Sequence, residues 1–154
     1  MTASPSALSA GTYSGLVTIR PSGLDTVTIP VTLAVSDVQG KLLVSQRGLS
    51  FTAVSQGGAP LPQSLGVLNV GAGSLNWTTR VSTFRGGDWL RATSASGASA
   101  ANSLIVPTVD VTVVPRNLAP GEYQGQIEFL SNGAVNSPQR VTVSLQVLPP
   151  GSNP

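Results

Sequence analysis

Residues 8–19 read LSAGTYSGLVTI and residues 118–129 read LAPGEYQGQIEF, so one motif occurs twice in the chain. Each copy has a glycine, a tyrosine and a second glycine at alternate positions, namely Gly11, Tyr13 and Gly15 in the first and Gly121, Tyr123 and Gly125 in the second. The shift between the copies is 121 − 11 = 110 residues. Recurrence at the length of one small β domain indicates a tandem repeat.

A second pair of matching segments follows the two copies. Residues 29–35 read IPVTLAV and residues 141–147 read VTVSLQV, at a shift of 147 − 35 = 112 residues. Apolar side chains alternate with smaller or polar ones, which is the period of a strand with one buried face. We therefore expect two hairpins, at 12–36 and 123–148, and the turn of the second is two residues longer.

These repeats predict the fold class and the division of the chain. We expect an all-β protein, an immunoglobulin-like antiparallel β-sandwich with an additional N-terminal β-hairpin. Residues 1–37 are expected to be the closing hairpin of a preceding repeat, residues 38–148 a complete sandwich, and residues 149–154 a linker tail. A length of 154 residues fits one module and part of another. We expect the chain to be an excerpt of a longer protein.

Alternation and turn residues predict the other strands of the sandwich. They are expected at residues 41–44, 49–53, 64–70, 75–81, 89–93, 104–106 and 109–114. Residues 94–102 are rich in Ser and Ala and are expected to form a loop. The inward positions of the strands predict a core that includes Leu75, Trp77, Val81, Val111, Val113, Tyr123, Ile127, Phe129, Val141, Val143 and Leu145.

The absence of certain residue types excludes several kinds of chemistry. The chain has neither Cys nor His, so it offers no thiolate nucleophile, no Ser-His-Asp triad and no Cys/His metal site. The six acidic residues are dispersed, and no two are spaced as an acid/base pair. We therefore expect no enzyme, no cofactor and no metal.

Charge and hydropathy limit the classes of binding partner that we expect. Lys41 and seven Arg residues are scattered without a run, so we expect no nucleic-acid partner despite a pI of about 9.7. No stretch approaches the ~20 apolar residues of a membrane span, so no membrane insertion is expected. The expected partners are neighbouring repeats or identical subunits, and a glycan is a further candidate.

Tyr123 follows a Pro-Gly turn at the start of a strand. In sandwich domains a tyrosine in this place returns its hydroxyl to the backbone and forms a tyrosine corner. Tyr13 repeats the pattern, and repeats preserve architecture. We therefore interpret both tyrosines as structural, in preference to an exposed binding role.

Residues 41–148 resemble the BACON-type immunoglobulin-like domains of large bacterial secreted and surface proteins. The resemblance lies in Leu49-Ser-Phe51, Leu75-Asn-Trp77, residues 88–97 (DWLRATSASG) and residues 118–125 (LAPGEYQG). It implies a sandwich of seven or eight strands in an extracellular or cell-surface protein of a bacterium. It also implies a carbohydrate-binding or spacer role, and the family has no catalytic motif to transfer.

Three functions remain open on the sequence. The first is a non-catalytic structural or spacer repeat. The second is a carbohydrate-binding module, for which the one compact set of suitable side chains is Phe84, Arg85, Asp88, Trp89 and Arg91. Trp89 adjoins Leu90 in an expected strand, so one of the two must face inward, and a buried Trp89 would remove the aromatic platform.

The third function is self-assembly by strand addition through the N-terminal hairpin. An isolated two-stranded hairpin is marginal in water. The second arm nevertheless has a full row of apolar residues on one face, Val27, Ile29, Val31, Leu33 and Val35. We expect this face to be covered by protein, either in the same chain or in a neighbour.

Overall fold

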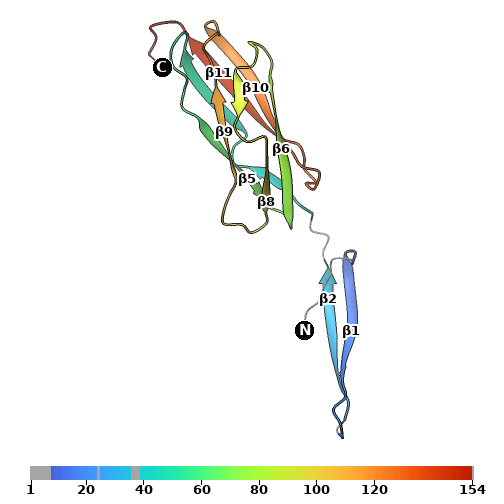
Figure 1. Cartoon of the computed structure of the whole chain (residues 1–154). Helices are drawn as coiled ribbons and strands as arrows, with labels where there is room; N and C mark the ends of the chain where they lie inside the picture. Colours follow the sequence, from blue (N-terminus) through green and yellow to red (C-terminus); the bar gives the residue numbers. More distant parts are fainter. Residues whose placement is uncertain (1–7, 24, 36–38, 154) are drawn as a thin grey trace. The chain divides into compact units, whose positions relative to one another are not determined.

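The computed structural model describes residues 8–23, 25–35 and 39–153, and every regular element in these ranges is a strand (Figure 1). The chain divides into two compact units between Val38 and Gln39. The boundary expected between residues 37 and 38 lies outside the described residues, as does Ser36, the expected end of the first hairpin.

The first unit is an antiparallel hairpin. It consists of β1 (Gly11–Ile19) and β2 (Val27–Val35), and all nine residues of each strand are paired. Both strands lie within the hairpin expected at 12–36, except that β1 begins one residue earlier, at Gly11. β1 and β2 form a two-stranded sheet of their own.

The second unit is a sandwich of two sheets (Figure 1). The five-stranded sheet has the order β4-β11-β10-β6-β8, and the four-stranded sheet has the order β3-β5-β9-β7. Adjacent strands are antiparallel except β4 and β11, which pair in parallel. The strands are β3 (Leu42–Val44), β4 (Gly48–Val54), β5 (Gln63–Asn69), β6 (Ser74–Thr83), β7 (Leu90–Ala92), β8 (Ser96–Ala100), β9 (Thr108–Val113), β10 (Gly121–Leu130) and β11 (Gln139–Leu148).

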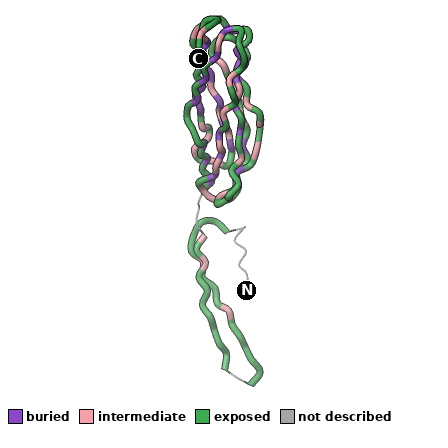
Figure 2. The backbone as a smooth tube through the Cα atoms, turned by 90° about the vertical axis from the view of Figure 1, so that its left-hand side faces the viewer, coloured by how far each residue is buried: buried purple, intermediate pink, exposed green. Residues whose placement is uncertain are grey.

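The core lies between the two sheets, where buried residues occupy alternate positions along β4, β5, β6, β9, β10 and β11 (Figure 2). The predicted core is confirmed at ten of its eleven positions, and the eleventh, Val81, is partly buried and packs against the core. Phe129 packs edge-on against Trp77, with ring centroids 6.0 Å apart. An all-β immunoglobulin-like sandwich is therefore the fold of the second unit.

The loop predicted at residues 94–102 is wrong, because β8 lies within it. β8 reads SGASA and pairs with β6. Its side chains are too small to show the alternation of buried and exposed types that identifies a strand. Packing explains the glycine at position 97, because a Cβ there would overlap the indole ring of Trp77.

The strand predicted at residues 104–106 is also wrong. This segment contains no strand, and Leu104 and Ile105 are 100% and 82% exposed. Oγ of Ser103 accepts a hydrogen bond from the Ile105 amide and donates one to its carbonyl oxygen. Local bonds of this kind compete with pairing in a sheet.

Candidate functional site

The two hairpins have the same pairing register. Gly11 pairs with Val35 in the first, and Gly121 pairs with Val147 in the second. Each residue of β1 therefore corresponds to the residue of β10 that is 110 positions later, and each residue of β2 to the residue of β11 that is 112 positions later. The sequence repeat is a repeat of backbone structure.

Both hairpins also contain a tyrosine corner. The Tyr13 hydroxyl donates to the Ser9 carbonyl oxygen, and the Tyr123 hydroxyl donates to the Ala119 carbonyl oxygen, each at 2.9 Å. In both cases the acceptor lies four residues before the tyrosine. The structural interpretation of the two tyrosines is confirmed.

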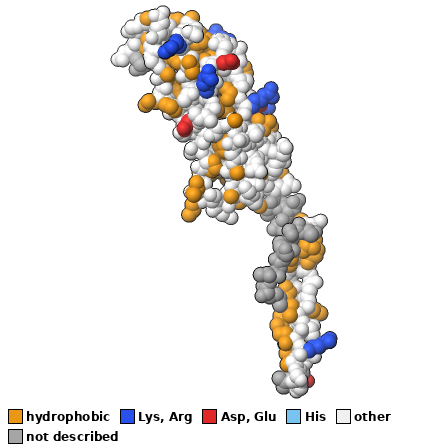
Figure 3. All heavy atoms as spheres, in the orientation of Figure 1, with side chains coloured by type: hydrophobic (Ala, Val, Ile, Leu, Met, Phe, Trp, Pro, Cys, Tyr) orange, Lys and Arg blue, Asp and Glu red, His pale blue; other side chains and the backbone are white. Residues whose placement is uncertain are grey.

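The corresponding apolar faces differ in exposure. Val141 and Val143 on β11 are 0% exposed, whereas their counterparts Ile29 and Val31 on β2 are 45% and 37% exposed. Of the five assembly residues expected on this face, Val27, Ile29 and Val31 are exposed, and Leu33 and Val35 are half-buried. Hydrophobic side chains run along the hairpin in a strip (Figure 3).

Trp89 lies inside the core and is 2% exposed. Its indole nitrogen donates to the Arg85 carbonyl oxygen at 2.9 Å, and its ring packs edge-on against Tyr123. Leu90 is buried as well, so both neighbours face inward, and the buried Trp89 provides no aromatic platform for a glycan. β7 begins only at Leu90, and the alternation of a strand does not extend to Trp89.

The other four candidate glycan residues line two separate hollows. Phe84, which is 65% exposed, and Arg85 line a hollow of about 320 Å³. Asp88 and Arg91 line another of about 270 Å³. The structure therefore does not bring the five residues together around one pocket.

Arg85 is held in place by Tyr123 and by the backbone of β10. Its guanidinium lies 4.8 Å from the centre of the Tyr123 ring and donates to the Glu122 carbonyl oxygen. The next residue, Gly86, has a φ of 85° and lies so close to Tyr123 that a Cβ would meet the ring. Phe84 is left as the exposed aromatic side chain of this turn.

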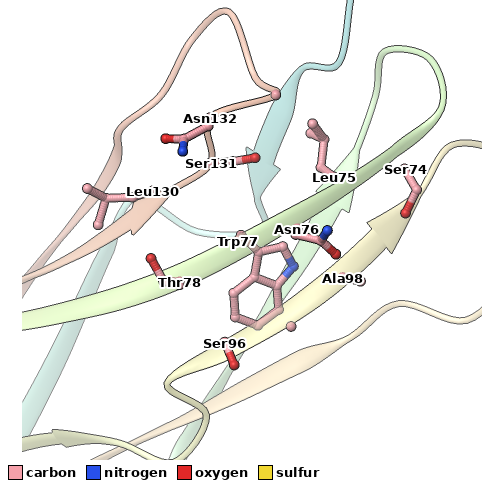
Figure 4. A pocket seen from close by; sticks show the side chains of 12 residues that line it. Ser74, Leu75, Asn76, Trp77, Thr78, Ser96, Ala98, Leu130, Ser131 and Asn132 are labelled. Atoms are coloured by element: carbon pink, nitrogen blue, oxygen red, sulfur yellow. The ribbon is translucent and has the colours of Figure 1, made fainter.

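A larger hollow, of about 800 Å³, lies beside β6 and β8 (Figure 4). Asn76, Thr78, Ser96 and Asn132 surround it with amide and hydroxyl groups, and the residues that line it include no acid or base. The sequence pattern does not predict this hollow, because β8 lacks the alternation by which a strand is identified. Its polar groups can donate and accept hydrogen bonds, but Trp77, which also lines it, is buried and presents no open ring face.

The described ranges lack two further functional features. They contain no group of three His, Cys, Asp or Glu residues that could hold a metal ion. They also contain no helix that could cross a bilayer.

Comparison with known proteins supports the fold class alone. No protein-family model matches the chain, and no curated protein matches it in sequence. Similar solved structures include the ASH/PapD-like domain 7 of human CEP192, with a TM-score of 0.56 and 16% identity over 77% of this chain and 93% of that one.

Two others illustrate the range of proteins that share the fold. The periplasmic chaperone SfaE has a TM-score of 0.53 and 11% identity, over 69% of this chain and 57% of the chaperone. A putative carbohydrate-binding protein from Bacteroides ovatus has a TM-score of 0.53 and 8% identity, over 69% of this chain and 36% of that protein. The chain thus resembles immunoglobulin-like, PapD-like sandwich domains found in proteins of different function.

Proposed function

We propose that the chain is a non-catalytic structural repeat of a bacterial extracellular protein with several immunoglobulin-like modules. One observation carries the proposal: the hairpin of the first unit repeats the hairpin that ends the second, with the same register and the same tyrosine corner. Recurrence of one structural unit along a chain is typical of arrays in which each module contacts its neighbours.

The BACON-type identity and the extracellular or surface location belong to this proposal. They rest on the motifs that the sequence shares with that family. Only 9% of the residues are charged, and Ser and Thr occupy many exposed strand positions. The residues with catalytic potential are dispersed over the described strands and turns, which favours a structural role over an enzyme.

A carbohydrate-binding module is the second candidate, and exposed Phe84 is the observation in its favour. An aromatic ring beside Arg85, Glu122 and Gln124 has the composition of a small sugar site. The site would be formed around Phe84 alone, because Trp89 is buried. The aromatic platform would therefore consist of one ring, whereas the sequence suggested two.

A glycan array tests both candidates with the full chain, a Phe84→Ala variant and a Val135→Ala control. Val135 is also exposed, at 63%, but does not line the Phe84 hollow. The structural function predicts no binding above background for any of the three proteins. A glycan that binds the chain and the control with sub-millimolar affinity, and that Phe84→Ala loses while its melting temperature is unchanged, would establish the second candidate instead.

A further inference from the structure

Gly15 and Gly125 occupy corresponding places in the two hairpins. A Cβ added to Gly125 would lie 2.8 Å from Cδ2 of Leu90 and 3.4 Å from the Trp89 ring, so this glycine lets both side chains pack directly on the backbone of β10. A Cβ added to Gly15 meets nothing within 4 Å. Glycine weakens a strand because it has no side chain to pack and loses more conformational entropy on folding. The hairpin by itself gives no reason for a glycine at this position.

Two residues after the glycine in each hairpin, an inward-facing cross-strand pair consists of one Ile and one Val, and the two hairpins have them on opposite strands. Ile127 on β10 pairs with Val141 on β11, whereas Val17 on β1 pairs with Ile29 on β2. Because each pair contains one Ile and one Val, its combined side-chain volume is the same in both hairpins. Volume-conserving changes are those that a packed core tolerates best. The two hairpins therefore have matching thickness at this layer.

We propose that the N-terminal hairpin closes a second β-sandwich, whose other strands belong to a preceding immunoglobulin-like repeat of the same protein. That repeat has a bulky apolar pair opposite Gly15, as Trp89 and Leu90 lie opposite Gly125. In that repeat, the strand that corresponds to β4 pairs with β2, because β4 is the neighbour of β11. The strand that corresponds to β6 pairs with β1, because β6 is the neighbour of β10. The inference rests on the proposed structural function and names the partner of the exposed face.

Two positions argue against a second copy of this chain as the partner. Phe129 packs edge-on against Trp77, and its counterpart Ile19 would leave a cavity beside that ring. The Thr142 amide donates to a backbone carbonyl just before β4, and its counterpart Pro30 has no N–H to donate. A second copy also has its own β10 and β11 in the place that the hairpin would take.

The test extends the chain at its N-terminus with a second copy of residues 39–117, joined directly to Leu8. The hairpin then follows β3–β9 at the same sequence spacing as β10 does. Ile19→Phe and Pro30→Thr remove the two mismatches in this extended chain, and the same two changes are made in the unextended chain for reference. We expect amide hydrogen exchange in β1 and β2 to be slower in the extended chain by on the order of 100-fold, because a marginal hairpin becomes part of a core.

Gly15→Val separates packing against a core from simple hairpin formation. In the extended chain its side chain would collide with the added copies of Trp89 and Leu90, so exchange should return to the rate of the unextended chain. In the unextended chain, Gly15→Val should not accelerate amide hydrogen exchange in β1 and β2. Ser14→Val, one residue away and on the opposite face of the strand, is the matched control and should keep the protection.

Unprotected β1 and β2 in the extended chain would overturn the proposal, as would equal effects of Gly15→Val and Ser14→Val. Slow exchange in the unextended native chain would also overturn it. In that case a mass that rises with concentration would identify a second copy as the partner, and a constant monomer mass would identify the chain's own second unit. A glycan bound at Phe84 would refute the structural function while leaving these exchange rates unchanged, so the two failures are distinguishable.

Discussion

The indole nitrogen of Trp77 donates a hydrogen bond of 2.9 Å to Oγ of Ser99, and that hydroxyl donates to the Val67 carbonyl oxygen at 2.6 Å. Trp77 and Ser99 lie in the five-stranded sheet, and Val67 lies in the four-stranded one. A single buried hydroxyl thus satisfies a tryptophan and links the two layers of the sandwich.

Ser99→Ala should lower the free energy of unfolding by about 1 to 3 kcal/mol, because it leaves the buried Trp77 N–H and the Val67 carbonyl without this partner. Ser96→Ala is the control on the same strand, where the side chain is exposed, and it should change stability by less than about 0.5 kcal/mol. Urea unfolding followed by tryptophan fluorescence measures both. Equal midpoints for the two variants would contradict the bridging role.

Trp77→Ala should cost about 3 to 5 kcal/mol, since it removes a buried aromatic ring and leaves a cavity beside Phe129. Thermal unfolding monitored by circular dichroism is the measurement. A melting temperature equal to that of the unmodified chain would show that the core is not centred on this residue.

Tyr123→Phe should destabilise the second unit by about 1 kcal/mol, because the Ala119 carbonyl oxygen loses its hydroxyl partner. Tyr13→Phe removes the corresponding bond to Ser9 and is the matched control, which should leave the main unfolding transition unchanged. If both variants shifted that transition equally, the two units would not unfold independently. The comparison requires only denaturant curves of three proteins.

Asn136 holds β3 to the loop between β10 and β11. Its Oδ1 accepts from the Leu42 amide at 2.9 Å, and its Nδ2 donates to the Leu42 carbonyl oxygen at 2.8 Å. Asn136→Ala should cost about 1 to 3 kcal/mol and accelerate amide exchange in β3, whereas Asn132→Ala, at an exposed site in the same loop, should do neither. Unchanged exchange in residues 42–44 of the Asn136 variant would argue against this role.

Deletion of residues 1–36 should leave the second unit folded with an unchanged free energy of unfolding. This unit has its own closing strands, β10 and β11, in the centre of its sheet. Chemical denaturation of the shortened and the full chain, at equal concentration, compares the two. A loss of more than about 1 kcal/mol would mean that the hairpin contributes to the stability of the sandwich.

The strands that sequence reasoning found are those with branched or aromatic side chains on one face. β2 and β11 alternate so regularly that the sequence predicts both as strands with one apolar face. β8 was missed because Ser, Gly and Ala at its five positions give no alternation, although Gly97 is there to accommodate Trp77. A strand was wrongly predicted at Leu104–Val106 because apolar composition alone does not show that Ser103 bonds locally.

The candidate site was harder to predict than the fold. Phe84, Arg85, Asp88, Trp89 and Arg91 are close in sequence, but a turn through Gly86 and Gly87 sends Trp89 inward and divides the others between two hollows. The signal available beforehand was the pair of glycines, which indicates a tight turn in which strand alternation cannot be applied. The polar hollow beside β8 depends on a strand that the sequence pattern did not reveal.

β10 and β11 are the last strands of the module in sequence, yet they lie in the middle of its larger sheet, between β4 and β6. A ribosome therefore releases β4 and β6 well before the strands that pair with them, and the nascent module exposes open sheet edges until it is finished. Pairing over such sequence distances is slow. In an array of similar modules, a finished hairpin of one repeat can reach the open sheet of the next during translation. Differences between hairpins, such as Ile19 in one and Phe129 in the other, would destabilise such a mispaired module, because Ile19 would leave a cavity beside the ring that corresponds to Trp77.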